Sequence, residues 1–196
     1  MIIKRQVLKL AILLVASSLA ADIRPRLNIS AGWAGSYRLD KNAKNIYSPF
    51  TMSPHGRIEV RLVDNIAIYC AGQYSQEAGN TYPEGSIETK LKSICMDYGI
   101  GYRIGEKRIV LMPHGGITFV HMKESAFGES EKRTIRGYHA GIKLNFYLGE
   151  SGYFMMLASY SSAKLVTHSS FDVGGVRFQV GLGTHIRLFE SIYSED

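Results

Sequence analysis

Three residues with the composition of a hydrolytic triad, His168, Ser170 and Asp172, lie close together in a polar segment. A histidine can accept the proton of a serine hydroxyl, and a carboxylate can orient that histidine. Serine and histidine are also ordinary residues of polar loops, and no further catalytic motif accompanies them. We therefore predict no enzyme, and we keep a hydrolase that uses these three residues as an alternative.

The remaining histidines and glycines indicate neither a metal site nor a cofactor site. His55, His114, His121 and His139 lie too far apart in the sequence to form a recognisable metal motif. No glycine-rich loop that could hold a phosphate follows a strand and opens a helix, because no helix is expected in the mature chain. We predict that the protein uses no metal ion and no cofactor.

Charged residues alternate with apolar residues in several segments, so that one enclosed face would collect the charges. Buried charges must be paired or hydrated, and we predict Glu59 and Asp97 as hubs of a salt-bridge network. Such a face could form an anion path, but an eight-stranded barrel has room for little beyond its own side chains, and we favour a plugged interior. The predicted network contains Arg57, Glu59, Arg61, Asp97, Arg103, Lys143, Arg177 and Arg187, with His139 and His185 on the same face.

A predicted loop at 39–53 combines basic residues with aromatic residues. Lys41, Lys44, Tyr47 and Phe50 are the members that suit binding to an acidic surface, through charge and through aromatic anchors. The alternative is a solvated loop whose aromatic residues rest on the rim of the barrel. The loop at 123–133 is rich in charges of both signs and is predicted to be hydrated.

Period-2 alternation predicts the strands that position these residues. In 176–188, apolar residues at even positions alternate with polar residues or glycine at odd positions. The segments 94–104 and 138–148 repeat the pattern, which a helix would scatter around its circumference. Weaker strands fill the remaining gaps. The sequence therefore predicts eight strands, at 27–37, 57–63, 66–74, 94–104, 109–121, 138–148, 153–165 and 176–188.

The predicted connections fall into two classes. Short turns lie at 64–65, 105–107 and 149–151, and longer polar loops lie at 39–53, 77–88, 123–133 and 167–174. Strands of about ten residues can cross a bilayer at a tilt, and short periplasmic turns with long external loops are typical of bacterial outer-membrane barrels. The predicted fold is all-β, an eight-stranded antiparallel up-and-down transmembrane β-barrel.

A soluble periplasmic carrier of the lipocalin type is the competing architecture, because its strands also alternate apolar and polar residues and it is also exported. A soluble barrel fills its interior with apolar side chains, whereas the polar face here mixes charges with glycine and would make a poor core. The apolar face carries aromatic residues near strand ends, where the girdles of membrane barrels lie. The expected girdle residues include Tyr102, Phe146, Tyr153, Phe178 and Phe189.

The first 20 residues have the pattern of a cleaved secretory signal peptide. Basic residues precede an apolar run at 10–15, and small residues lead to the expected cleavage site after Ala20. We expect one domain, the barrel, from 21 to 196. Cys70 and Cys95 could form a disulfide in an oxidising compartment, although the predicted strands place their side chains on opposite faces.

The formal net charge of +6 indicates an acidic partner. An exported protein rarely meets nucleic acid, so we exclude that partner. Anionic lipopolysaccharide or a polyanionic host surface fits the charge and the expected location better.

The segment 111–117, Leu-Met-Pro-His-Gly-Gly-Ile, is similar to the proline-tyrosine-glycine strand of small outer-membrane barrels, with His114 where tyrosine is usual. Together with the signal peptide and the alternating last strand, it makes the chain resemble the opacity, OmpX/Ail and OmpA transmembrane-domain groups. The resemblance implies export through the Sec pathway, contact with outer-membrane lipid and lipopolysaccharide, and insertion by the barrel-assembly machinery. Phe189 suits the terminal aromatic residue of these proteins, although 190–196 follow it.

The same resemblance implies a structural or surface-binding role, adhesin-like or opacity-like, through external loops. The His168-x-Ser170 pattern instead resembles the lipid A deacylase barrels, with Phe171 where asparagine is usual and Asp172 in place of a more distant glutamate. A lipid A-modifying hydrolase and the soluble carrier are therefore the two alternative functions.

Overall fold

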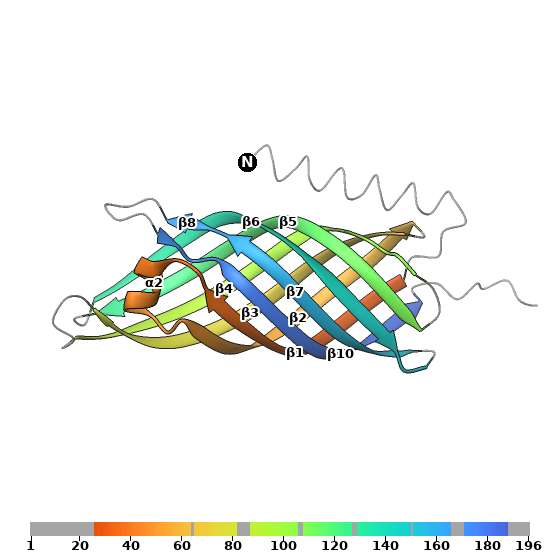
Figure 1. Cartoon of the computed structure of the whole chain (residues 1–196), viewed down its shortest axis with the longest axis horizontal. Coiled ribbons are helices and arrows are strands. Elements are labelled where there is room, and N and C mark those ends of the chain that lie inside the picture. The colour runs from red at the N-terminus through yellow and green to blue at the C-terminus, as the bar shows by residue number, and fades with distance from the viewer. Residues whose placement is uncertain are drawn as a thin grey trace, which may run out of the picture.

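Eight long antiparallel strands close into a single barrel in the computed structural model, which describes residues 26–63, 65–81, 87–105, 108–126, 129–149, 151–165 and 171–187. The predicted fold class is confirmed (Figure 1). The predicted signal peptide and Phe189 lie outside the described residues. The barrel strands are β1 (Arg26–Arg38), β2 (Phe50–Val63), β3 (Ile66–Thr81), β4 (Ile87–Tyr102), β5 (Ile109–Ala126), β6 (Glu129–Tyr147), β7 (Gly152–Ser162) and β10 (Gly175–Arg187).

The first and last strands pair with each other and so close the barrel. β1 runs antiparallel to β10 from the pair Arg26–Arg187 to the pair Arg38–Gly175, and its other edge pairs with β2. Because every strand of the barrel has two neighbours, the barrel leaves no row of backbone donors and acceptors open toward lipid.

Apolar side chains point outward from the barrel and polar side chains point inward. On β10, Phe178 is 61% exposed, whereas its neighbours Arg177 and Gln179 are buried in the lumen. A lipocalin-like carrier has the opposite distribution, with an apolar interior, so the structure contradicts the alternative of a soluble carrier. The outward apolar surface is suited to lipid.

Inward-facing glycines make room for large side chains in the lumen. A Cβ atom on Gly99 would lie 2.6 Å from the Tyr69 hydroxyl, and one on Gly183 would lie 2.5 Å from the Tyr153 hydroxyl. Tyr153 itself is 1% exposed, so the prediction that it belongs to the outer girdle is wrong. The parity of β7 explains this, because its odd positions face inward. Tyr102 and Phe178 do lie on the outer surface.

β2 begins at Phe50 rather than at 57, so the end of the loop predicted at 39–53 is strand. Four further neighbouring strands, β3 to β6, are also longer than predicted, at 16, 16, 18 and 19 residues. Most of the loops predicted at 77–88 and 123–133 is therefore strand. The sequence signal was absent there because both faces of these extensions carry polar residues, while the backbone ladder continues from the membrane-spanning part.

One short helix, α2 (Lys41–Ile46), lies in the connection between β1 and β2, where no helix was expected. Asp40 precedes it, and its Oδ1 accepts a hydrogen bond from the Ala43 amide at 3.1 Å. This is the geometry of an aspartate N-cap, which stabilises even a single turn. Among the described residues, no helix has the length and apolar character required to span a membrane.

Two very short strands, β8 (Lys164–Leu165) and β9 (Phe171–Asp172), pair beside the outer end of β7. They lie at the same end of the barrel as α2 (Figure 1). The cysteines do not bond. Cys70 is on the outer face of β3, Cys95 faces the lumen from β4, and both are free thiols, as the predicted faces imply.

Candidate functional site

Glu59, on β2, is the centre of one cluster of buried charges in the lumen. Arg57 Nε donates a hydrogen bond to Glu59 Oε2 at 2.7 Å, and Lys143 Nζ donates to the same oxygen. Asn28 Nδ2 donates to Oε1 at 3.3 Å. All four residues are buried, so this one carboxylate compensates two cations that would otherwise be costly to bury.

Asp97, on β4, is the centre of a second cluster nearer the extracellular end. Arg177 Nη1 lies 2.8 Å from Asp97 Oδ2, and Thr118 Oγ1 donates to Oδ1 at 2.6 Å. His139 Nδ1 lies 3.6 Å from the same Oδ1 and 2.9 Å from the Thr118 hydroxyl. The carboxylate is thus held by partners on three other strands.

Tyr69 connects the two clusters across the lumen. The Arg57 guanidinium lies 3.6 Å from the centre of the tyrosine ring, and the tyrosine hydroxyl is hydrogen-bonded to His139 Nε2. A third contact joins the same hydroxyl to His114 Nδ1 at 2.9 Å. Sequence reasoning missed Tyr69 and Thr118, although the alternation of β3 and β5 gave their inward direction.

The other predicted network residues lie toward the opposite, periplasmic end. Arg103 is half-buried and its Nη2 donates to the Tyr147 hydroxyl at 3.0 Å, and the His185 ring packs edge-on against Tyr147. Arg61 is half-buried, and the side chain of Arg187 lies outside the described residues. The structure therefore brings together Arg57, Glu59, Asp97, Lys143 and Arg177, while Arg61 and Arg103 stand apart.

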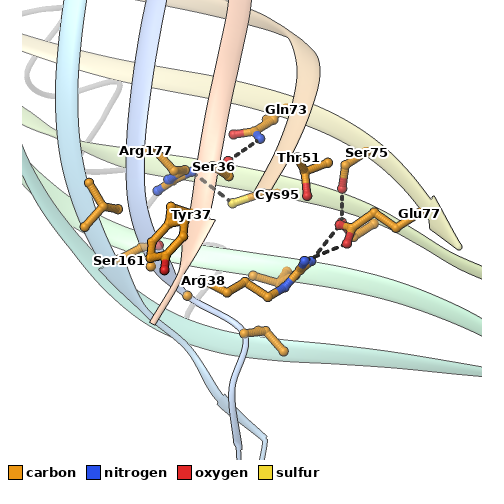
Figure 2. Close-up of a pocket in the computed structure, with 16 residues that line it drawn as sticks. Ser36, Tyr37, Arg38, Thr51, Gln73, Ser75, Glu77, Cys95, Ser161 and Arg177 are labelled. Carbon is orange, nitrogen blue, oxygen red and sulfur yellow. Dashed lines mark hydrogen bonds and ion pairs between the residues drawn. The ribbon is translucent and has the colours of Figure 1, made fainter. Parts of the chain in front are cut away.

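A small polar cavity of about 70 Å³ lies above the Asp97 cluster, at the extracellular mouth (Figure 2). The guanidinium of Arg38 bridges it, donating two hydrogen bonds of 2.6 Å to the Glu77 carboxylate. Arg177 and Cys95 contribute to the lining, together with hydroxyl side chains. A space of this size holds a few water molecules. The serine and threonine residues of the lining are Ser36, Thr51, Ser75, Ser93 and Ser161.

An apolar cluster fills the mouth beside this cavity. Tyr47, from the connection after α2, is 4% exposed and donates a hydrogen bond from its hydroxyl to Glu124. Burial raises the pKa of the Tyr47 phenol, and the hydrogen bond to Glu124 raises it further, so this group remains a donor. The prediction of Tyr47 as an exposed anchor is wrong. The cluster consists of Tyr47, Leu91, Val120, Met122, Ile135 and Ala163.

The other three residues predicted for surface binding remain at the surface. Lys41 is exposed at the start of α2, and Phe50 is 52% exposed at the start of β2. Lys44 Nζ lies 3.2 Å from the Tyr37 hydroxyl and 4.6 Å from the centre of that ring. This cation is therefore held against the rim of the barrel.

Asp172 has a structural role that differs from the predicted catalytic one. Its carboxylate accepts hydrogen bonds from the Ser162 hydroxyl at 2.6 Å and from the Ala163 and Gly174 amides at 2.8 Å. Its own amide donates to Asp40 Oδ2 at 3.1 Å, which ties β9 to the connection that contains α2. His168 and Ser170 lie outside the described residues.

Within the described ranges, no group of three or more His, Cys, Asp or Glu side chains could hold a metal ion. The buried side chains of the lumen form ion pairs and hydrogen bonds. The lumen places its charges on the strands, and the mouth is closed by side chains from the β1–β2 connection, from the segment after β7 and from the outer parts of β4, β5 and β6.

The fold is similar to those of small bacterial outer-membrane barrels. The crystal structure of Ail from Yersinia pestis, the attachment invasion locus protein, shares 19% sequence identity, with a TM-score of 0.53, over 83% of this chain and 99% of that chain. OprG from Pseudomonas aeruginosa shares 11%, with a TM-score of 0.69, over 83% and 96%. Neisserial surface protein A shares 12%, with a TM-score of 0.53, over 84% and 97%.

A second crystal structure shows Ail in complex with the heparin analogue sucrose octasulfate. No protein-family model and no curated protein matches the sequence. At these identities the similarity confirms the predicted fold, an eight-stranded β-barrel like those of small outer-membrane proteins.

Proposed function

We propose that the protein is a surface-binding protein of the bacterial outer membrane, adhesin-like or opacity-like, that acts through its extracellular end while its lumen stays closed. Export through the Sec pathway, insertion by the barrel-assembly machinery and contact with lipopolysaccharide belong to this proposal. The observation that carries it is the closed mouth, because a partner can then meet only the outer surface.

Two layers support a closed lumen. The apolar cluster around Tyr47 fills the mouth, and the Arg38–Glu77 ion pair lies beside it. Below them the cations of the lumen are bonded to Glu59 and Asp97, so a passing ion would have to break these contacts.

The exposed residues at the mouth favour an acidic ligand. Lys41 and Lys44 place two cations on α2, and the neighbouring Phe50 offers an exposed aromatic ring. Arginine, lysine and aromatic side chains at a rim are suited to sulfated or phosphorylated polymers, which combine charge with apolar ring faces. The complex of the similar barrel Ail with a heparin analogue supports a polyanion as the ligand class.

Binding to immobilised heparin by the refolded barrel tests this proposal. We expect salt-sensitive binding that K41Q/K44Q weakens about tenfold, since each cation near an anionic surface contributes roughly a factor of five and Lys44 is partly engaged. R26Q/R108Q is the matched control, because it removes two exposed cations from the periplasmic end. Equal losses in both variants would show nonspecific charge attraction instead.

Planar bilayer recordings test the closed lumen. We expect no stable conductance from the wild-type barrel. The conductance should increase only when the side chains that fill the mouth are removed, as in Y47A/R38A. A steady anion-selective conductance of the wild type would overturn the closed-lumen part and restore the anion path.

A further inference from the structure

The wall of the barrel is much taller on one side than on the other. β3 to β6 contain 16 to 19 residues, whereas β1 and β10 contain 13 and β7 contains 11. The long hairpins project past α2 at the extracellular end (Figure 1). The outer face of these projections is therefore a surface that the shorter strands do not have.

The apolar band on β4 ends at a definite level. On β4, outward residues run from Tyr102 to Ile94, a rise of about 20 Å for a strand tilted by about 40°. This is close to the ~25 Å apolar band of membrane barrels. The next outward residue on β4 is Lys92, which is exposed just above the band.

Three lysines, Lys92, Lys123 and Lys132, lie side by side at this level, and we call them the lysine row. Lys92 on β4 is the direct register partner of Lys123 on β5, and Lys123 is the direct partner of Lys132 on β6. All three are exposed on the outer face. Direct cross-strand neighbours have Cβ atoms about 5 Å apart, and like charges at that distance are destabilising.

Nothing in the described part of the chain neutralises the lysine row. The ion pairs found there do not include Lys92, Lys123 or Lys132. On the same outer face, His121 lies one outward position below Lys123, and Arg136 lies two outward positions below Lys132, opposite Phe119. The arrangement concentrates positive charge without a partner among the described side chains.

Three acidic residues of these hairpins whose side chains are described, Glu77, Glu124 and Glu131, are at inward positions of their strands. Glu77 pairs with Arg38, Glu124 accepts the Tyr47 hydroxyl, and Glu131 pairs with Arg133 at 2.6 Å. The two faces are thus sorted by charge, and among the described side chains the outer face above the apolar band carries no carboxylate.

We propose that the lysine row binds the phosphate groups of the phosphorylated glycolipid in the outer leaflet, the lipid A part of lipopolysaccharide. Phosphates at this height accept hydrogen bonds from the lysine ammonium groups and relieve their mutual repulsion. The acyl chains then lie on the apolar band below, against Ile94 and the paired rings of Tyr98 and Phe119. This inference rests on the outer-membrane location in the proposed function but not on polyanion binding at the mouth.

Titration of the refolded full barrel in detergent with lipid A, followed by native mass spectrometry, tests the lysine row. We expect K92Q/K123Q/K132Q to bind bisphosphorylated lipid A about 100-fold more weakly than the wild type, at about fivefold per lysine. K92R/K123R/K132R should retain binding. The matched control K41Q/K44Q/K164Q removes three charges at the mouth and should retain lipid A binding while its heparin binding falls at least about tenfold.

The probes separate a lipid headgroup from free phosphate and from acyl contacts. We expect dephosphorylated lipid A to bind the wild type and K92Q/K123Q/K132Q equally weakly, and millimolar inorganic phosphate not to compete. Unchanged lipid A affinity in K92Q/K123Q/K132Q, or full affinity for the dephosphorylated lipid, would overturn the inference. The heat-dependent gel shift of each variant establishes that it is folded, and heparin binding reports separately on the proposed function.

A second readout distinguishes a binding site from a surface that is merely charged. Without lipid A, K92Q/K123Q/K132Q should be at least as resistant to thermal unfolding as the wild type, because like charges are removed. With lipid A present, only the wild type should gain resistance. Equal gains in both proteins would also contradict the lysine row as the site.

Discussion

At the scale of single residues, the two lumenal carboxylates have more effect on stability than any exposed charge. Glu59 is buried and compensates both Arg57 and Lys143, so E59Q should leave a buried cation unpaired and lower the free energy of unfolding by about 3 kcal/mol or more. Urea unfolding in detergent micelles measures this loss. E131Q is the control, because it removes an exposed carboxylate and should leave the stability unchanged.

Single glycines are also required for folding where a neighbouring strand or aromatic ring leaves no space for a Cβ atom. A Cβ at Gly99 would lie 2.3 Å from the carbonyl oxygen of Gly115, which cannot move without breaking the ladder. G99A should therefore reduce the yield of folded barrel, measured as the fraction with a heat-dependent gel shift. G152A should fold normally, because nothing lies within 4 Å of the added atom.

One substitution, at Ser170, tests the hydrolase alternative. S170A should leave the lipid A of the host strain unchanged in mass spectrometry, because Asp172, the expected orienting carboxylate, is engaged in the β9 turn. Accumulation of an acylated lipid A form in that variant would establish the hydrolase instead.

At the scale of elements, closure of the mouth depends on the connection that carries α2. Asp40 caps the helix through Oδ1 and accepts the Asp172 amide through Oδ2, so it links α2 to β9. D40A should destabilise this cover by about 1 kcal/mol and speed hydrogen exchange of the amides at 41–47. D40N should keep the helix cap through its single amide oxygen but lose the acceptor for the Asp172 amide, so its exchange should lie between those of D40A and the wild type. Unchanged exchange in D40A would show that packing of Tyr47 holds the cover alone.

At the scale of the whole molecule, closure of the sheet makes the barrel one cooperative unit. Because every strand is paired on both sides, no strand can detach without opening the ladder at two edges. The unboiled protein should therefore migrate differently from the boiled protein in SDS gels. A band that does not change with heating would contradict the closed membrane barrel.

The sequence by itself determined the architecture and the direction of most side chains. Alternation in segments such as 176–188 requires one apolar face, and a two-residue period fixes which residues share it. This is why Arg57, Glu59, Asp97, Lys143 and Arg177 could be assigned to the lumen. The face of Cys70 relative to Cys95 followed in the same way.

Only the tertiary structure decided what is in contact, because contacts across the barrel depend on register and shear, which the chain does not display locally. Tyr47 is buried only because the mouth closes over it. Asp172 accepts the Ser162 hydroxyl only because β9 lies beside the end of β7. The lysine row could be found only from the register of three strands, because both faces are polar in this region and the sequence shows no periodicity there. The sequence showed which face of a strand a residue occupies, but it did not show how neighbouring strands are aligned with each other.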